Sequence, residues 1–193
     1  EVIEQTAPFD MLIHLGDGEG SEELITSWCL EQNQNCEVHM VLGNNDFFSC
    51  LDREKEISIG PYRAFLTHGH FYSVSVGPER LEEEARSRGV DIAMFGHTHK
   101  PFLEDRNGIT VLNPGSLSFP RQEGRRPSYM IMEVDGSGKA SFQICFLENM
   151  RKESKKRKKE YLPGREANRR GERSAQLSSF NLIEEKKLKK KVS

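Results

Sequence analysis

Two histidines one residue apart, His97 and His99, follow an apolar segment that runs from Val90 to Phe95. If a strand continued through them, their side chains would point to opposite faces. Gly96 indicates instead that the chain turns here, and a turn can direct both imidazoles to one point. Imidazole is the commonest protein ligand for a transition metal, so this spacing is typical of a metal-binding loop. The pattern alone also fits two solvated histidines without a ligand.

Three further loops place metal-competent side chains after apolar segments. Phe9–Leu15 is followed by Gly16-Asp17, Val38–Leu42 by Gly43-Asn44-Asn45-Asp46, and the segment ending at Thr67 by His68-Gly69-His70. Carboxylate, amide and imidazole groups form a mixed O/N set that suits Mn, Fe, Ni or Zn, and the lack of thiolate argues against a structural zinc site. Asn and Asp are also common turn formers. The repetition at strand after strand favours one shared site where the strands end, as in open α/β sheets.

The ordered set of these loops resembles the calcineurin-like metallophosphoesterases, and within them the small prokaryotic phosphodiesterases of the YfcE type. The turn Asn113-Pro114-Gly115-Ser116 also fits that branch. The likeness covers about residues 1–148. It implies a four-layer α/β sandwich, in which two mixed β-sheets are flanked by helices. It also implies a metal-dependent phosphodiesterase in which a hydroxide that bridges two cations attacks a phosphate diester.

The resemblance also implies the ligands of two divalent cations. By this analogy Asp17 bridges both metals, Asn44, His68 and His97 complete the site of one metal, and His99 belongs to the other. Mn is the expected metal, with Ni, Fe or Zn as alternatives. The expected substrate is a phosphodiester, either a small molecule or a nucleotide.

Two residues of the same loops are candidate catalytic residues. Asp46 either orients a ligand or forms a turn, and we favour the first interpretation. His70 either contacts the substrate phosphate or only fills its loop. Many relatives have a His at the position of Asn45, where it assists the leaving group, and an Asn cannot donate a proton in this way. This difference favours diesters with good leaving groups.

A second departure concerns the start of the chain. The family opens with a strand ending in Asp-x-His, which supplies two further ligands to the metal of His99, and no such pair precedes Asp17. We therefore expect the chain to lack a strand and a helix, on the order of 20 residues. Most of one metal site would be missing with them, so the activity of the chain as given stays open. The rival interpretation is a non-catalytic scaffold or binding protein with the same fold.

The elements that must position these loops follow from hydrophobic periodicity and from turn residues. We expect the end of a helix before Pro8 and a helix from Ser21 with an apolar face of Leu24, Ile25, Trp28 and Cys29. Further on we expect a hairpin over 57–67 with its turn at Gly60-Pro61, a helix over 78–88, and hairpins over 102–112 and 129–147. Strands alternate with helices in the first half, whereas the second half is antiparallel.

The charge divides the chain into two parts. Residues 1–150 carry 12 basic and 24 acidic residues, whereas residues 151–193 carry 16 and 6. We therefore expect a metallophosphoesterase domain over 1–148 and a basic, disordered tail over 149–193. The tail either is simply solvated, which we favour, or binds nucleic acid or an anionic surface weakly.

Four cysteines, Cys29, Cys36, Cys50 and Cys145, occur without CxxC pairing. This argues against a disulfide framework and favours reduced thiols in a cytoplasmic protein. The sequence shows no apolar run of the ~18 residues that a membrane-spanning helix needs. No signal peptide is visible either, although the chain begins at Glu1 and the native start can lie upstream. No motif predicts an oligomeric state.

Overall fold

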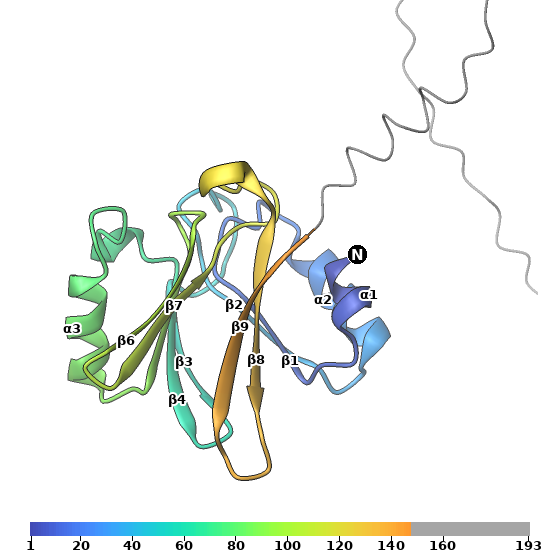
Figure 1. Ribbon diagram of the computed structural model, residues 1–193. Helices are drawn as coiled ribbons and strands as arrows, with labels where there is room; N and C mark the ends of the chain where they lie inside the picture. Colours follow the sequence, from blue (N-terminus) through green and yellow to red (C-terminus); the bar gives the residue numbers. More distant parts are fainter. Residues whose placement is uncertain (148–193) are drawn as a thin grey trace, which may run out of the picture. The chain divides into compact units, whose positions relative to one another are not determined.

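The computed structural model describes residues 1–147 of the chain (Figure 1). Its helices are α1 (Val2–Thr6), α2 (Glu22–Gln32) and α3 (Glu79–Arg88), with short 3₁₀ helices η1 (His70–Tyr72) and η2 (Glu123–Arg125). Its strands are β1 (Met11–His14), β2 (Glu37–Met40), β3 (Glu54–Ile59), β4 (Tyr62–Thr67), β5 (Ile92–Phe95), β6 (Pro101–Arg106), β7 (Ile109–Pro114), β8 (Ser128–Val134) and β9 (Ala140–Phe146). The basic tail expected over 149–193, and with it any nucleic-acid contact, lies outside the described residues.

A mixed five-stranded sheet forms the centre of the fold, in the order β3-β4-β5-β7-β6. The three inner strands β4, β5 and β7 are parallel, and the edge strands β3 and β6 are antiparallel to their neighbours. All four residues of β5 and the last four of β4 are buried. Both faces of the inner strands are therefore covered, which explains why these segments read as continuous apolar runs.

The helix α3 covers one face of this sheet. Its Leu81 and Ala85 pack against Phe65 of β4, Ala93 of β5 and Val111 of β7. The helix begins just after Pro78, and it ends at Gly89, which has a φ of +62°. This is the common arrangement of a proline at the start and a glycine at the end of a helix.

Two small sheets cover the other face: the parallel pair β1–β2 and the antiparallel pair β8–β9. Leu15 and Val41, which directly follow β1 and β2, pack with Leu66, Met94 and Met130. Figure 1 shows α1 and α2 on the side of the molecule away from α3. The order helix, sheet, sheet, helix confirms the α/β sandwich, although the second sheet consists of two separate hydrogen-bonded pairs in residues 1–147.

The apolar face expected for α2 is only partly buried. Cys29 is fully covered, but Leu24 and Trp28 are 49% and 44% exposed. The reason is the small size of β1–β2, since two strands of four residues offer little surface to a helix of three turns. Among the helices of residues 1–147, none has the length and apolar character needed to cross a membrane.

Candidate metal centre

The loops after β1, β2, β4 and β5 approach one another unusually closely. A Cβ on Gly16 would lie 2.6 Å from Nδ1 of His68 and 2.7 Å from Cα of Gly43. A Cβ on Gly43 would in turn overlap the backbone nitrogen and the carboxylate of Asp17. The chain can bring these loops together only because glycine lacks a side chain at both positions.

Asp46 holds the first two loops together. Its Oδ2 accepts hydrogen bonds from the backbone N–H groups of Gly43 (2.7 Å) and Asp17 (2.8 Å), and its Oδ1 accepts one from Glu19 (2.7 Å). Burial raises the pKa of this carboxyl group, but the three donors outweigh it and hold the pKa below its usual value of 3.8. Asp46 is therefore ionised, and its hydrogen bond to the backbone N–H holds the Asp17 loop in place.

His68 lies at the bottom of the cluster, with only 2% of its surface exposed. Its Nδ1 lies 2.6 Å from the carbonyl oxygen of Leu15, which can only accept, so Nδ1 carries the proton and donates it. Its Nε2 faces Oδ1 of Asn44 at 3.0 Å and Oδ2 of Asp17 at 3.6 Å. Burial lowers the pKa of His68 and favours the neutral ring.

His97 and His99 point into the same cluster. His97 donates from Nδ1 to Oδ1 of Asn44 over 2.8 Å. His99 donates from Nδ1 to the carbonyl oxygen of Phe119 over 2.9 Å, and its Nε2 lies 3.9 Å from Oδ2 of Asp17. Asp17, His97 and His99 have φ values of 60°, 61° and 57°, which few residues other than glycine adopt. The turn expected at Gly96 is thus present and directs both rings inward.

Asn45 and His70 lie beside this cluster. Asn45 donates from its backbone N–H (3.0 Å) and from its side-chain amide (2.9 Å) to the carboxylate of Asp17. The ring of His70 lies 5.3 Å from that of His68 and 6.0 Å from that of His97, measured between centroids. Burial, and then the neighbouring His68, lower the pKa of His70. Its Nδ1 is covered and has no hydrogen-bond partner among residues 1–147.

The sequence interpretation missed two residues that shape the site. Asn113 is fully buried, and its amide donates to the carbonyl of Gly96 (2.7 Å) and to the hydroxyl of Thr98 (3.1 Å), which fixes the histidine loop. An Asn directly after the apolar run of β7 was the available signal. Arg121 donates its backbone N–H to the carbonyl of His99 (3.0 Å), and its positive charge contributes to the lowered pKa of His97, of which burial is the main cause.

The structure therefore brings together all five expected metal-binding side chains: Asp17, Asn44, His68, His97 and His99. Within residues 1–147, no three His, Cys, Asp or Glu side chains form a metal-holding group by themselves. Oδ1 of Asn44 lies within hydrogen-bond distance of both Nε2 of His68 and Nδ1 of His97. His14 and His39 lie in β1 and β2, and both are partly buried.

Comparison with known proteins gives a consistent result. A profile of the calcineurin-like phosphoesterase superfamily domain matches residues 1–137. The chain is 32% identical over 120 residues to the probable metallophosphoesterase MJ0623 of Methanocaldococcus jannaschii, which covers 62% of this chain and 59% of that protein. It is 37% identical over 81 residues to the phosphodiesterase YfcE of Escherichia coli, which covers 42% of this chain and 40% of YfcE. The chain thus spans less than two thirds of both relatives.

Solved structures share the fold. A protein from Streptococcus pneumoniae, described as a predicted phosphoesterase, superposes with a TM-score of 0.61 at 28% identity, over 76% of this chain and 78% of the other. Vps29 from Entamoeba histolytica complexed with Zn²⁺ superposes with a TM-score of 0.58 at 26% identity, over 73% and 84%. The profile covers more than half of the chain, and the sequence motifs and the fold agree with it. The chain therefore belongs to the calcineurin-like phosphoesterase superfamily.

Proposed function

We propose that the chain carries the active site of a metal-dependent phosphodiesterase. The observation that supports this most is the orientation of His68 and His99. Each donates its Nδ1–H to a backbone carbonyl, so that the lone pair of Nε2 faces the carboxylate of Asp17. Histidines that bind metal commonly use their other ring nitrogen in this way, which fixes the tautomer and the ring.

The contacts among these side chains fit a bound cation. When His68 is neutral, its Nε2 lone pair faces Oδ1 of Asn44 at 3.0 Å, and two acceptors at this distance repel each other. Both atoms could instead bind a cation, which would remove this repulsion, and the Asp17 carboxylate would add negative charge. Amide oxygen, carboxylate and imidazole together suit Mn, Fe, Ni or Zn. The family likewise implies divalent metal ions.

We assign the ligands as the resemblance implies. Asn44, His68 and His97 would hold one cation, Asp17 would contact both cations, and His99 would contact the other, with Mn as the metal to test first. When bound, the cations supply an activated water and positive charge for the phosphate oxygens.

Other residues of the chain prepare the site for a phosphate diester. Asp46 keeps the Asp17 loop in place, and Asn113 does the same for the histidine loop. His70, with its covered and unpartnered Nδ1, is proposed as a contact to the substrate phosphate. Because Asn44 and Asn45 are exposed while His68 is buried, the diester enters from the asparagine side.

The test is hydrolysis of bis(p-nitrophenyl) phosphate by the full-length protein with Mn²⁺, together with titration of Mn²⁺ by calorimetry. We expect His97→Ala and Asp17→Asn to lose both metal binding and turnover, since each removes a ligand. His39→Ala is the matched control, because His39 lies in β2 and pairs with Glu37 instead. Unchanged metal binding and hydrolysis in both site variants would contradict the proposal.

The scaffold interpretation gives a different result in the same experiment. If the full-length protein binds Mn²⁺ through the same ligands but does not hydrolyse the diester, a non-catalytic binding protein with this fold becomes the better description. The Zn²⁺ complex of Vps29 shows a metal bound to a protein of this fold.

A further inference from the structure

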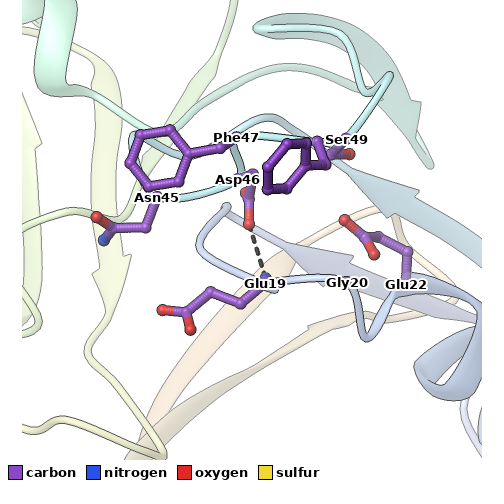
Figure 2. A pocket seen from close by; sticks show the side chains of 8 residues that line it. Glu19, Gly20, Glu22, Asn45, Asp46, Phe47 and Ser49 are labelled. Atoms are coloured by element: carbon purple, nitrogen blue, oxygen red, sulfur yellow. Dashed lines mark hydrogen bonds between the residues drawn. The ribbon is translucent and has the colours of Figure 1, made fainter.

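A pocket of about 400 Å³ lies next to the candidate metal centre, and the loop that contains Asp46 borders it (Figure 2). Its lining residues are Glu19, Gly20, Glu22, Asn45, Asp46, Phe47, Phe48 and Ser49. None of the assigned metal ligands lines it. Asn45 and Asp46 belong to both places, because they bond to the side chain and backbone of Asp17 on one side and border the pocket on the other.

The pocket combines aromatic rings with carboxylates. Figure 2 shows Phe47 on one side of it and Glu19 and Glu22 on the other, with Asp46 between them. Phe47 and Phe48 are 80% and 100% exposed, although phenylalanine is usually buried. Both rings line the pocket and are accessible to a ligand there.

Among the described residues, no cationic side chain lines the pocket to balance its negative charge. Its described lining contains carboxylates but no Lys or Arg. Oε1 of Glu22 is covered, yet it has no hydrogen-bond partner among residues 1–147. Asp46 already accepts three backbone hydrogen bonds, so Glu19 and Glu22 are the carboxylates left for a ligand. A partly covered carboxylate oxygen without a hydrogen-bond partner favours the binding of a cation beside it.

We infer that this pocket binds an organic ammonium group, and that the substrates of the neighbouring site are phosphodiesters in which one ester group carries a positive charge. Aromatic faces with nearby carboxylates are the usual recognition elements for quaternary ammonium ions. The pocket volume lies in the range that holds small ligands. This inference rests on the proposed phosphodiesterase function for the substrate, but the binding of the ammonium group does not.

The binding test therefore uses ligands without phosphate. Choline and 3,3-dimethylbutan-1-ol have nearly the same shape, and only choline is charged. We expect saturation-transfer NMR with the full 193-residue chain to show choline binding about five- to tenfold tighter than the neutral alcohol. Glu22→Gln and Phe47→Leu should each remove most of this preference. Glu23→Gln is the matched control, since Glu23 is exposed and does not line the pocket.

Three results would overturn the inference. The first is equal affinity for choline and the neutral alcohol, and the second is an undiminished preference in both pocket variants. The third is an equal loss of preference in Glu23→Gln, which would show that choline responds only to the general negative charge. Circular dichroism of each variant checks folding, and Phe47→Leu changes a side chain that is already exposed.

Hydrolysis then separates this inference from the proposed function. In p-nitrophenyl phosphocholine, the oxygen of water bonds to phosphorus and the bond to p-nitrophenolate breaks, which releases phosphocholine, p-nitrophenolate and a proton. We expect kcat/KM for this diester to exceed that for its 3,3-dimethylbutyl isostere, and the ratio to fall in Glu22→Gln. Cleavage of both diesters with equal kcat/KM refutes the inference alone. Choline binding without any diester cleavage by the full-length protein refutes the proposed function alone.

Discussion

Replacing Asp46 tests how the first two loops of the site are held together. Asp46→Asn keeps the size and shape of the side chain but turns one oxygen into an NH₂ group. Wild-type Oδ2 serves Gly43 and Asp17, and Oδ1 serves Glu19. The single amide oxygen of Asn can accept either from Gly43 and Asp17 or from Glu19. The NH₂ group then faces the remaining backbone N–H, and two donors oppose each other.

The expected cost follows from these three bonds. Hydrogen bonds to charged groups contribute about 1.5–3 kcal/mol each, and neutral ones about 1 kcal/mol. Asp46→Asn loses one bond and weakens the others, so we expect the free energy of unfolding to fall by about 3 kcal/mol. For a chain of this size that corresponds to a Tm lower by about 6–12 °C. Asp46→Ala should cost more, because the buried N–H of Gly43 is left without an acceptor.

Urea or thermal unfolding followed by fluorescence measures this cost. Trp28 is the single tryptophan of the chain and lies in α2, close in sequence to the loop that Asp46 holds. Asp52→Asn is the matched control, because Asp52 is exposed and only loosely paired with Lys55 at 3.9 Å. Mn²⁺ affinity should fall in Asp46→Asn as well, since Asp17 loses its support.

The dependence on pH gives a second signature. The pKa of Asp46 is lowered in the folded state, so its contribution is present above the unfolded value of 3.8 and is lost as pH falls through the lower folded value. The difference in stability between wild type and Asp46→Asn should therefore shrink below about pH 4. If the free energies of unfolding of Asp46→Asn and Asp52→Asn differ by less than about 0.5 kcal/mol at neutral pH, Asp46 does not hold the two loops together as described.

Further predictions concern other parts of the described chain. Gly43→Ala should separate the Asp17 and Asn44 loops and reduce Mn²⁺ affinity. Gly136→Ala is the control, because a Cβ at Gly136 meets no atom within 4 Å. Equal Mn²⁺ affinities of the two variants would contradict the close contact between Gly43 and Asp17. Glu82 accepts hydrogen bonds from Arg106, Asn107 and Arg86, which lower its pKa to about 2. Glu82 therefore stabilises the fold above its usual pKa of 4.5, and this contribution is lost as the pH falls towards 2. Glu82→Gln should therefore be less stable than exposed Glu83→Gln at neutral pH and equal to it near pH 2, as acid unfolding will show. With Ellman's reagent, exposed Cys50 should react first and buried Cys29 last, since burial raises the pKa of Cys29 to about 11; a Cys50→Ser variant that keeps the fast phase would refute this order.

The sequence predicted the loops of the site better than the contacts that orient them. Gly96 before His97, and Gly16 before Asp17, are local signals, because a glycine after an apolar run marks a turn at the end of a strand. The acceptors of His68 and His99 are backbone carbonyls 53 and 20 residues away in the chain. A carbonyl oxygen has no residue-type signature, so sequence patterns do not reveal such partners.

The helix α2 shows the same limit for packing. Its spacing of Leu24, Trp28 and Cys29 correctly predicts a helix, but periodicity describes only the helix itself. Whether the apolar side is buried depends on how wide the neighbouring sheet is, and β1–β2 has two strands in the described residues. The hydrogen-bond partners of Asp46 and the role of Asn113 likewise needed the structure, since both residue types are common in turns.

The left-handed backbone of Asp17, His97 and His99 also bears on how such a site persists. Each residue is held in a conformation that costs about 1 kcal/mol, and glycine at the same position would avoid the cost. Mutations of these positions to glycine thus gain backbone stability while they remove a ligand. In a lineage that no longer needs the cluster, substitutions that remove it would increase the stability of the fold. Selection for what the cluster binds is therefore what keeps these residues in place.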